Sequence, residues 1–312
     1  MGIESDWIWF DGEWVPFADA KVHVLSHSLH YGLGAFEGIR SYTQPDGSAG
    51  VWCLDAHLQR FLDSLKMMCI EIPYSKEDLT RACLETLQRN GLTEAYLRPI
   101  AFLGMGAMGL GARSNPVHVA ISTWEWGAYL GDDGVQNGVS VKTSSFTRHH
   151  PNAALQRAKV IGHYVNSILA RYEANDDGFE EAIMLDHHGF VAEGTGENVF
   201  VVHGDEILTP PPTNILPGIT RRSVMEILAQ EGHEVKETSF GRDGFYVADE
   251  AWMVGTAAEV TPIRAVDRRV VGSGTPGPIT RMLQERYKAA ITGRLPSMKH
   301  HITTVAADPA KR

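Results

Sequence analysis

Short strand-like runs joined by tight turns constrain the fold of this chain more than any other feature. The segment WIWFDGEWVPF alternates around Asp11-Gly12, and two later segments turn at His188-Gly189 and Gly204-Asp205. Such runs, separated by two-residue turns, predict β-hairpins. The strands outnumber the helical segments, so we expect an α+β or mixed α/β fold without regular βαβ alternation.

Helical periodicity appears between the strands. Asp55 is expected to cap a helix with an apolar face, and Ser75 with Asp78 resembles the capping box of a second helix. Further helices are expected around residues 168–172, 218–232 and 277–291.

A chain of 312 residues is long enough for two domains. The Gly-, Asp- and Asn-rich segment 127–138 is the best candidate for an interdomain loop. We therefore expect a small N-terminal α/β domain at 1–126, a larger C-terminal domain at 139–295 and a frayed tail at 296–312.

The composition narrows the class of ligand and the compartment. A net charge of −10 argues against binding to nucleic acid or an anionic membrane, so any anionic ligand must be held by a few local cations. Three cysteines without a CxxC pair, and an N-terminus without signal-peptide features, predict a cytoplasmic globular protein.

Two local patterns are weak. GMGAMG at 104–109 has the spacing of a dinucleotide-binding loop, but Asn115-Pro116 prevents the helix that should follow, so we expect a loop beside a pocket. The histidines at 23, 27 and 30 lack partners at ligand spacing, so we expect no metal.

Four segments each allow two interpretations. Lys159, in AKVIGHY, is either a lysine at a strand end with its ammonium in water or a dry amine of lowered pKa suited to a Schiff base. Glu193, in EGTGENVF, is either a surface charge or the partner of a protonated ring nitrogen. The segments LPGITRRS (216–223) and MVGTAAE (253–259) are either plain turns or anion sites built from backbone N–H groups.

Seven segments, taken together, resemble the branched-chain amino acid aminotransferases, which are class IV aminotransferases of fold type IV. The resemblance covers about residues 7–294. In order, the segments are SHSLHYGLGAFEGIRSY, AYLRPIAF, WGAYLG, AKVIGHYVNS, EGTGENVF, LPGITR and DEAWMVGTAAEVTPIR. It implies a small α/β domain, a larger pseudo-barrel domain and pyridoxal 5'-phosphate as cofactor.

The resemblance also implies the roles of individual residues. Lys159 forms the internal aldimine and moves the substrate proton, Glu193 pairs with the pyridine nitrogen, and Tyr164 hydrogen-bonds the phenolic oxygen. These three are the expected catalytic residues. The remaining cofactor contacts, chiefly to the phosphate, are expected from Arg60, Gly218, Ile219, Thr220, Gly255 and Thr256.

By the same resemblance, the reaction is transamination of leucine, isoleucine and valine with 2-oxoglutarate. The expected substrate-binding residues are Tyr31, Phe36, Tyr96, Arg98, Leu110, Trp126, Tyr129, Thr256 and Ala257, with Tyr164 also lining the pocket. Tyr31 and Leu110 come from a neighbouring subunit in this family, which implies a homodimer or a larger homo-oligomer.

Other class IV enzymes stay open as alternatives: a D-amino acid or (R)-amine transaminase, or an aminodeoxychorismate lyase. Tyr96 with Arg98 and the WGAYLG segment favour the branched-chain enzymes. Ile161, Gly162 and His163 depart from the two glycines and asparagine that many relatives carry before the tyrosine, and the 104–116 loop can also differ. Both departures bear on substrate range.

Overall fold

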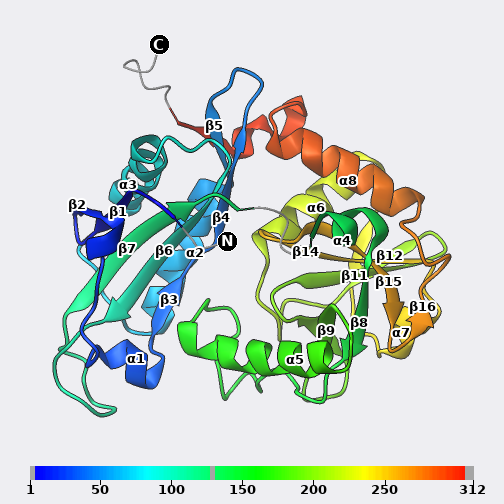
Figure 1. Cartoon of the computed structure of the whole chain (residues 1–312). Helices are drawn as coiled ribbons and strands as arrows, with labels where there is room; N and C mark the ends of the chain where they lie inside the picture. Colours follow the sequence, from blue (N-terminus) through cyan, green and yellow to red (C-terminus); the bar gives the residue numbers. More distant parts are fainter. Residues whose placement is uncertain (1–3, 127–130, 306–312) are drawn as a thin grey trace. The chain divides into compact units, whose positions relative to one another are not determined.

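The computed structural model describes residues 4–126 and 131–305 (Figure 1). The chain divides into two compact units. The first contains Met1–Trp126, Ala158–His163 and Ala289–Arg312, and the second contains Gly127–Arg157 and Tyr164–Lys288. The first unit thus includes two later segments that the sequence assigned to a continuous second domain and a tail.

The first unit is built on one antiparallel sheet with two main helices. Its strands are β1 Trp7–Phe10, β2 Glu13–Pro16, β3 Gly34–Phe36, β4 Ile39–Thr43, β5 Ala49–Trp52, β6 Ala95–Leu103, β7 Val117–Trp124 and β17 Ile302–Thr304. Its helices are η1 Phe17–Asp19, α1 His27–Tyr31, α2 Leu54–Met67, α3 Lys76–Arg89, η2 Ile161–His163 and η3 Pro296–His301. In the described part the strand order is β17-β5-β4-β6-β7-β1-β2, and β3 pairs with β6.

The predicted first hairpin is confirmed, since Trp9 of β1 lies opposite Trp14 of β2. Asp11 and Gly12 have φ values of 50° and 94°, as a two-residue turn with a left-handed backbone requires. The predicted capping box of Ser75 and Asp78 is also confirmed at the start of α3.

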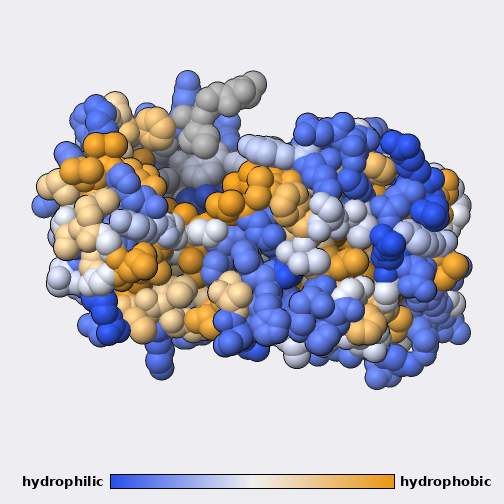
Figure 2. Space-filling model, turned by 90° about the horizontal axis from the view of Figure 1, so that it is seen from below, coloured by the Kyte–Doolittle hydropathy of each residue, from blue (hydrophilic) through white to orange (hydrophobic). Residues whose placement is uncertain are grey.

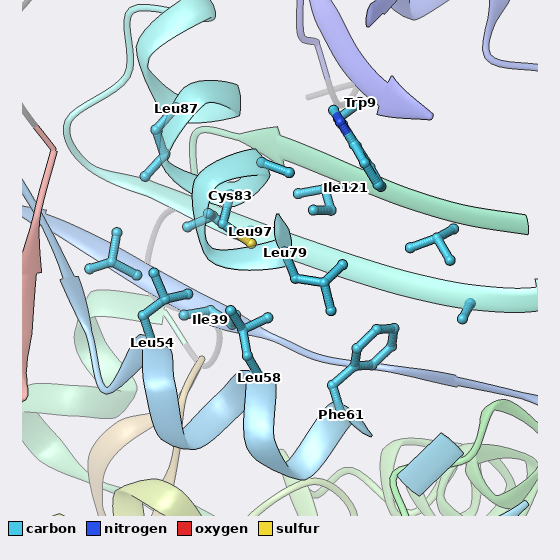
Figure 3. Close-up of a cluster of buried hydrophobic side chains, with 14 of the residues drawn as sticks. Trp9, Ile39, Leu54, Leu58, Phe61, Leu79, Cys83, Leu87, Leu97 and Ile121 are labelled. Carbon is cyan, nitrogen blue, oxygen red and sulfur yellow. The ribbon is translucent and has the colours of Figure 1, made fainter. Parts of the chain in front are cut away.

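The core of this unit lies between the sheet and helices α2 and α3. Leu58 and Phe61 project from α2 toward Leu79 and Cys83 of α3, and all four are fully buried (Figure 3). Burial of such side chains contributes about 1.5–3 kcal/mol each. This packing holds α2 in place, and α2 carries several residues of the candidate site.

Two local expectations in this unit were wrong. The α2 helix begins at Leu54 after Cys53, so Asp55 is not its cap but lies in the first turn, 2.6 Å from Lys76 Nζ. Residues 296–304 are not frayed: η3 buries Met298, and β17 pairs with β5. Residues 306–312 lie outside the described part of the chain.

The second unit contains a larger sheet. Its strands are β8 Val139–Thr143, β9 Glu181–Leu185, β10 Val191–Gly194, β11 Asn198–His203, β12 Glu206–Thr209, β13 Val235–Glu237, β14 Glu250–Gly255, β15 Glu259–Val266 and β16 Arg269–Val270. Their order is β10-β9-β8-β15-β14-β11-β12-β13, and β16 pairs with β15. The predicted hairpins β9–β10 and β11–β12 are confirmed.

The helices of this unit are α4 Gly131–Asn137, α5 Tyr164–Asp176, α6 Ile219–Gln230, α7 Asp243–Tyr246 and α8 Pro278–Ile291, of which the residues from Ala289 onward belong to the first unit. The presence of α4 means that much of the segment expected to be an interdomain loop is helical. The α5 helix packs on β8 and β9, and α6 packs on β14. None of the helices described here combines the length and apolar character needed to cross a membrane.

Candidate active site

Lys159 lies beside β3 and the C-terminal part of α2. Its backbone N–H donates to Ser64 Oγ at 3.0 Å, and its carbonyl accepts from the N–H of Phe36 at 3.1 Å. The Lys159 ammonium lies 5.0 Å from the centre of the Phe36 ring. Its sequence neighbours Ala158 and Val160 are buried. The lysine is therefore held on both sides of its backbone, with an aromatic face against its nitrogen.

Arg60, one turn before Ser64 on α2, forms a two-pronged ion pair with Glu37. Its Nε lies 2.7 Å from Glu37 Oε1, and its Nη2 lies 2.9 Å from Oε2. His57 Nδ1 lies 2.7 Å from the same Oε2. Burial alone would raise the pKa of Glu37, but Arg60 and His57 together hold it well below its usual range. The carboxylate is ionised and the guanidinium plane is fixed.

Arg98, on β6, is surrounded by aromatic rings. Its guanidinium carbon lies 4.7 Å from the centre of the Phe36 ring and 5.2 Å from that of Tyr96, and Tyr96 stacks on Trp126 at 5.0 Å. Among the described residues, the buried Nε of Arg98 has no hydrogen-bond partner. A guanidinium in this setting, with a donor still to satisfy, fits an acid ligand.

Tyr31 and Leu110, both expected to act in a neighbouring subunit, are exposed on the first unit. Tyr31 is 44 % exposed and its ring lies 4.5 Å from that of His27 at a tilt of 33°, and Leu110 is 92 % exposed. The loop carrying Leu110 is tied to α1 because His27 contacts the carbonyls of Gly104 and Gly109. Tyr129 lies outside the described residues.

The departure at residues 161–163 forms the short η2 helix. The N–H of Gly162 donates to the Gly32 carbonyl at 3.0 Å, and a Cβ at Gly162 would lie 3.1 Å from that oxygen. A glycine is therefore favoured at 162 by the close approach of α1, whereas Ile161 and His163 are not constrained in this way.

Glu193, in the second unit, is buried, and its carboxylate contacts three polar groups. Arg148 Nε lies 2.9 Å from Glu193 Oε1, and Oε2 accepts from Asn198 Nδ2 and from the Leu216 N–H, each at 3.2 Å. Arg148 also donates to Ser167 Oγ on α5 at 2.8 Å. Glu193 is thus not the surface charge that the sequence left open.

Asn198, which contacts Glu193, also lies against the N-terminus of α6. Asn198 Nδ2 also donates to the Leu216 carbonyl at 3.0 Å, and a Cβ on Gly218 would lie 2.0 Å from Asn198 Oδ1. Gly218 is the N-cap of α6 and provides no side-chain cap, so the first N–H groups, from Ile219 onward, belong to an uncapped helix end that suits an anion.

The turn after β14 contains the remaining predicted residues of this unit. Register places Val254 opposite Asn198, so Gly255 ends β14 beside Gly196 and Glu197 of the loop after β10, and Thr256 and Ala257 follow. Tyr164 is the first residue of α5, one turn before Ser167, which Arg148 contacts. Arg148 thus connects the beginning of the tyrosine's helix with the carboxylate of Glu193.

Sequence reasoning missed Glu37, Arg148 and Asn198. A glutamate between Phe36 and the apolar start of β4 is an unusual charge in a buried segment, which could have indicated Glu37. Arg148 carries no such local signal: it is buried and donates to the carbonyls of Gly194 and Thr195, which lie far along the chain.

Comparison with known proteins identifies the family. The model of amino-transferase class IV matches residues 34–266. The branched-chain-amino-acid aminotransferase of Pseudomonas aeruginosa is 48 % identical over 287 residues, which cover 92 % of this chain and 93 % of that protein. The chain belongs to the branched-chain-amino-acid aminotransferases of class IV. The corresponding enzyme of Escherichia coli K12 is 42 % identical over 292 residues, with 93 % and 94 % covered.

Solved structures of this aminotransferase family share the fold. The T.th. branched-chain amino acid aminotransferase with pyridoxamine 5'-phosphate matches with a TM-score of 0.95 and 44 % identity, covering 98 % of this chain and 100 % of that one. The Escherichia coli enzyme matches with a TM-score of 0.93, 40 % identity and coverage of 97 % and 100 %. The family resemblance and the mixed α/β, fold type IV class predicted from the sequence are confirmed.

Proposed function

We propose that this aminotransferase exchanges the amino group of leucine, isoleucine or valine with 2-oxoglutarate, with Lys159 as the residue joined to pyridoxal 5'-phosphate. Membership of the branched-chain family carries the reaction class and the cofactor. One observation above all supports the residue assignments: the backbone of Lys159 is hydrogen-bonded to Phe36 and to Ser64. Ser64 lies on α2, the helix that also carries Arg60.

The residues present fit the cofactor. When bound, it supplies an aldehyde for amines and a ring that accepts negative charge from the α-carbon. Glu193, paired with Arg148, would hold a proton on the ring nitrogen, and Tyr164 would donate to the phenolic oxygen. Arg60 and the N–H and hydroxyl groups at Gly218, Ile219, Thr220, Gly255 and Thr256 would hold the phosphate. The freed amine of Lys159 would remove the α-proton of the substrate and deliver it to the cofactor.

Arg98 and its aromatic neighbours are proposed to select the substrate. Phe36, Trp126, Tyr129 and Tyr164 would give apolar surface for a branched side chain. Tyr96 and the amides of Thr256 and Ala257 would hold the α-carboxylate. The unsatisfied Nε of Arg98 supports acceptance of the second carboxylate of glutamate. The T.th. enzyme has been solved with N-(5'-phosphopyridoxyl)-L-glutamate and with 4-methylvaleric acid, ligands of both kinds.

A homodimer or a larger homo-oligomer is part of the proposal, as is the cytoplasm, which the free thiols of Cys69 and Cys83 support. The 104–110 loop and α1 together expose an apolar patch, consisting of Val24, Leu29, Tyr31, Met105, Met108 and Leu110. Figure 2, which looks at the side on which α1 lies, shows hydrophobic side chains gathered over the first unit. If a second copy covered this patch, Tyr31 and Leu110 of each copy would contact the other copy.

The test combines labelling with a substrate scan. Borohydride reduction and peptide mapping should leave a pyridoxyl label on Lys159, and Lys159→Ala should abolish leucine–2-oxoglutarate exchange. Lys236→Ala, which removes an exposed lysine paired with Glu206, is the control and should retain full activity. A label on another lysine, or activity only on D-alanine, (R)-phenylethylamine or aminodeoxychorismate, contradicts the proposal.

A further inference from the structure

Glu37 carries a negative charge in the interior of the first unit, where packing alone does not require a charged side chain. Its side chain is fully buried at the end of β3, and its two oxygens take three close contacts, two from Arg60 and one from His57. Placing charges in a protein interior is costly, and an apolar replacement of a buried ion pair is often as stable or more stable. Stability therefore does not explain Glu37.

The geometry of the pair defines what Glu37 does to Arg60. A guanidinium has five N–H donors in a rigid plane, and Glu37 engages one edge of that plane, from Nε and Nη2. Because the guanidinium is rigid, fixing the Nε–Nη2 edge also fixes the direction in which the Nη1 N–H groups point. By engaging Nε and Nη2 together, Glu37 therefore sets the orientation of the opposite edge of the Arg60 guanidinium.

His57 fixes the carboxylate in turn. It lies one turn before Arg60 on α2 and contacts Glu37 Oε2 through Nδ1. Burial lowers the pKa of His57, and the contact with Glu37 offsets this only in part. The imidazole thus engages one oxygen of Glu37, while Arg60 engages both.

The same helix connects Arg60 to Lys159. Ser64 Oγ donates to the Arg60 carbonyl at 2.7 Å and accepts from the Lys159 N–H at 3.0 Å. The arginine fork and the lysine backbone are therefore fixed in one local frame, and a change at Glu37 would alter the fork without releasing the lysine.

We propose that Glu37 is a positioning residue that orients Arg60 toward the phosphate of the cofactor, and that His57 orients Glu37. The proposal rests on the proposed function, in which Arg60 binds that phosphate. Its signature is specific: Glu37 matters for a phosphorylated ligand and not for the ring alone.

The experiment compares the dissociation constants of pyridoxal 5'-phosphate and pyridoxal for the cofactor-free full chain. Glu37→Gln keeps the shape but removes the charge. It should weaken binding of the phosphorylated form at least about tenfold, the lower end of the effect of residues that orient metal ligands, and leave pyridoxal binding unchanged. On an Arg60→Lys background, Glu37→Gln should cause no further loss, because contacting residues that act as a unit are not additive.

The matched control is Glu181, the other fully buried glutamate described with an arginine partner, Arg171. Glu181→Gln should leave the ratio of the two dissociation constants unchanged. If Glu37→Gln fails to fold, His57→Gln, which removes one contact to the same carboxylate, should shift the ratio in the same direction and by less.

The outcomes separate the two levels of the argument. If Arg60→Lys leaves the ratio unchanged, the phosphate role of Arg60 fails and this inference fails with it. If Arg60→Lys lowers the preference for the phosphorylated ligand but Glu37→Gln weakens both ligands equally, or adds in full to Arg60→Lys, the positioning role alone is overturned. A Glu181→Gln variant with the same phosphate-specific loss also overturns it.

Discussion

Ser64→Ala tests whether the backbone of Lys159 depends on a single hydroxyl. The substitution removes the bond from Ser64 Oγ to the Arg60 carbonyl and the acceptor of the Lys159 N–H. The Arg60 carbonyl stays in the helical ladder of α2, so the first loss is small. The second leaves a donor without its acceptor in a partly buried site, which costs about 1–3 kcal/mol. We expect the free energy of unfolding to fall by about this amount.

Thr86→Val is the matched control. Thr86, on α3, is as fully buried as Ser64 and makes the same kind of bond to the carbonyl four residues earlier, at 2.6 Å. Its hydroxyl accepts no bond from another segment in the described contacts, so we expect a loss of no more than about 0.5–1.5 kcal/mol, that of one ordinary hydrogen bond.

The assay is urea unfolding of the cofactor-free protein together with hydrogen exchange at the Lys159 amide. Removing the cofactor matters because a ligand that binds only the folded state would hide part of the loss. Ser64→Ala should lower the urea midpoint more than Thr86→Val and speed exchange at Lys159. If both variants unfold at the same midpoint and exchange at Lys159 is unchanged, the hydroxyl does not hold the lysine.

Three further predictions concern other parts of the chain. Gly218→Ala forces Asn198 to move, so overpacking should lower the free energy of unfolding by about 1–3 kcal/mol and also weaken cofactor binding. The control Gly196→Ala places its Cβ more than 4 Å from any other atom and should leave the thermal unfolding midpoint unchanged. The buried His57 has a lowered pKa, so the unfolded chain binds the extra proton and stability should fall as the pH drops below 6.5; His57→Gln should flatten this slope in urea titrations. With a thiol reagent, exposed Cys69 should react in the folded protein, whereas Cys83, whose pKa burial raises to about 12, should react only after unfolding.

Local signals predicted much of the fold. The Asp11-Gly12 turn and the Ser75 capping box each act within four residues, so sequence alone was sufficient to find them. The start of α2 was misplaced because Cys53 adopts a left-handed conformation that its residue type does not favour. The pairing of β17 with β5 joins Ile302 to Trp52, two residues far apart in the sequence, and no local pattern encodes such a pairing.

The residues of the candidate site also differ in how far a local sequence signal could predict them. Lys159 and Glu193 could be proposed as site residues from the sequence because each lies in a recognisable segment. Glu37 and Arg148 were missed because their meaning lies in partners far along the chain: Glu37 contacts residues 20 and 23 positions away, and Arg148 contacts Glu193. A charge whose partner is distant in sequence looks like any other charge until the fold brings the two together.

The first unit depends on segments that are synthesised long after most of its strands. Its strands β1 to β7 are synthesised early, but Val160, which bridges to Ala35, and β17, which completes the sheet edge at β5, follow much later. A fragment ending at residue 126 would expose that edge and lack Lys159, the residue proposed to bind the cofactor. Completion of this sheet therefore waits until residues 302–304 have been translated, and products truncated before them should be prone to aggregation.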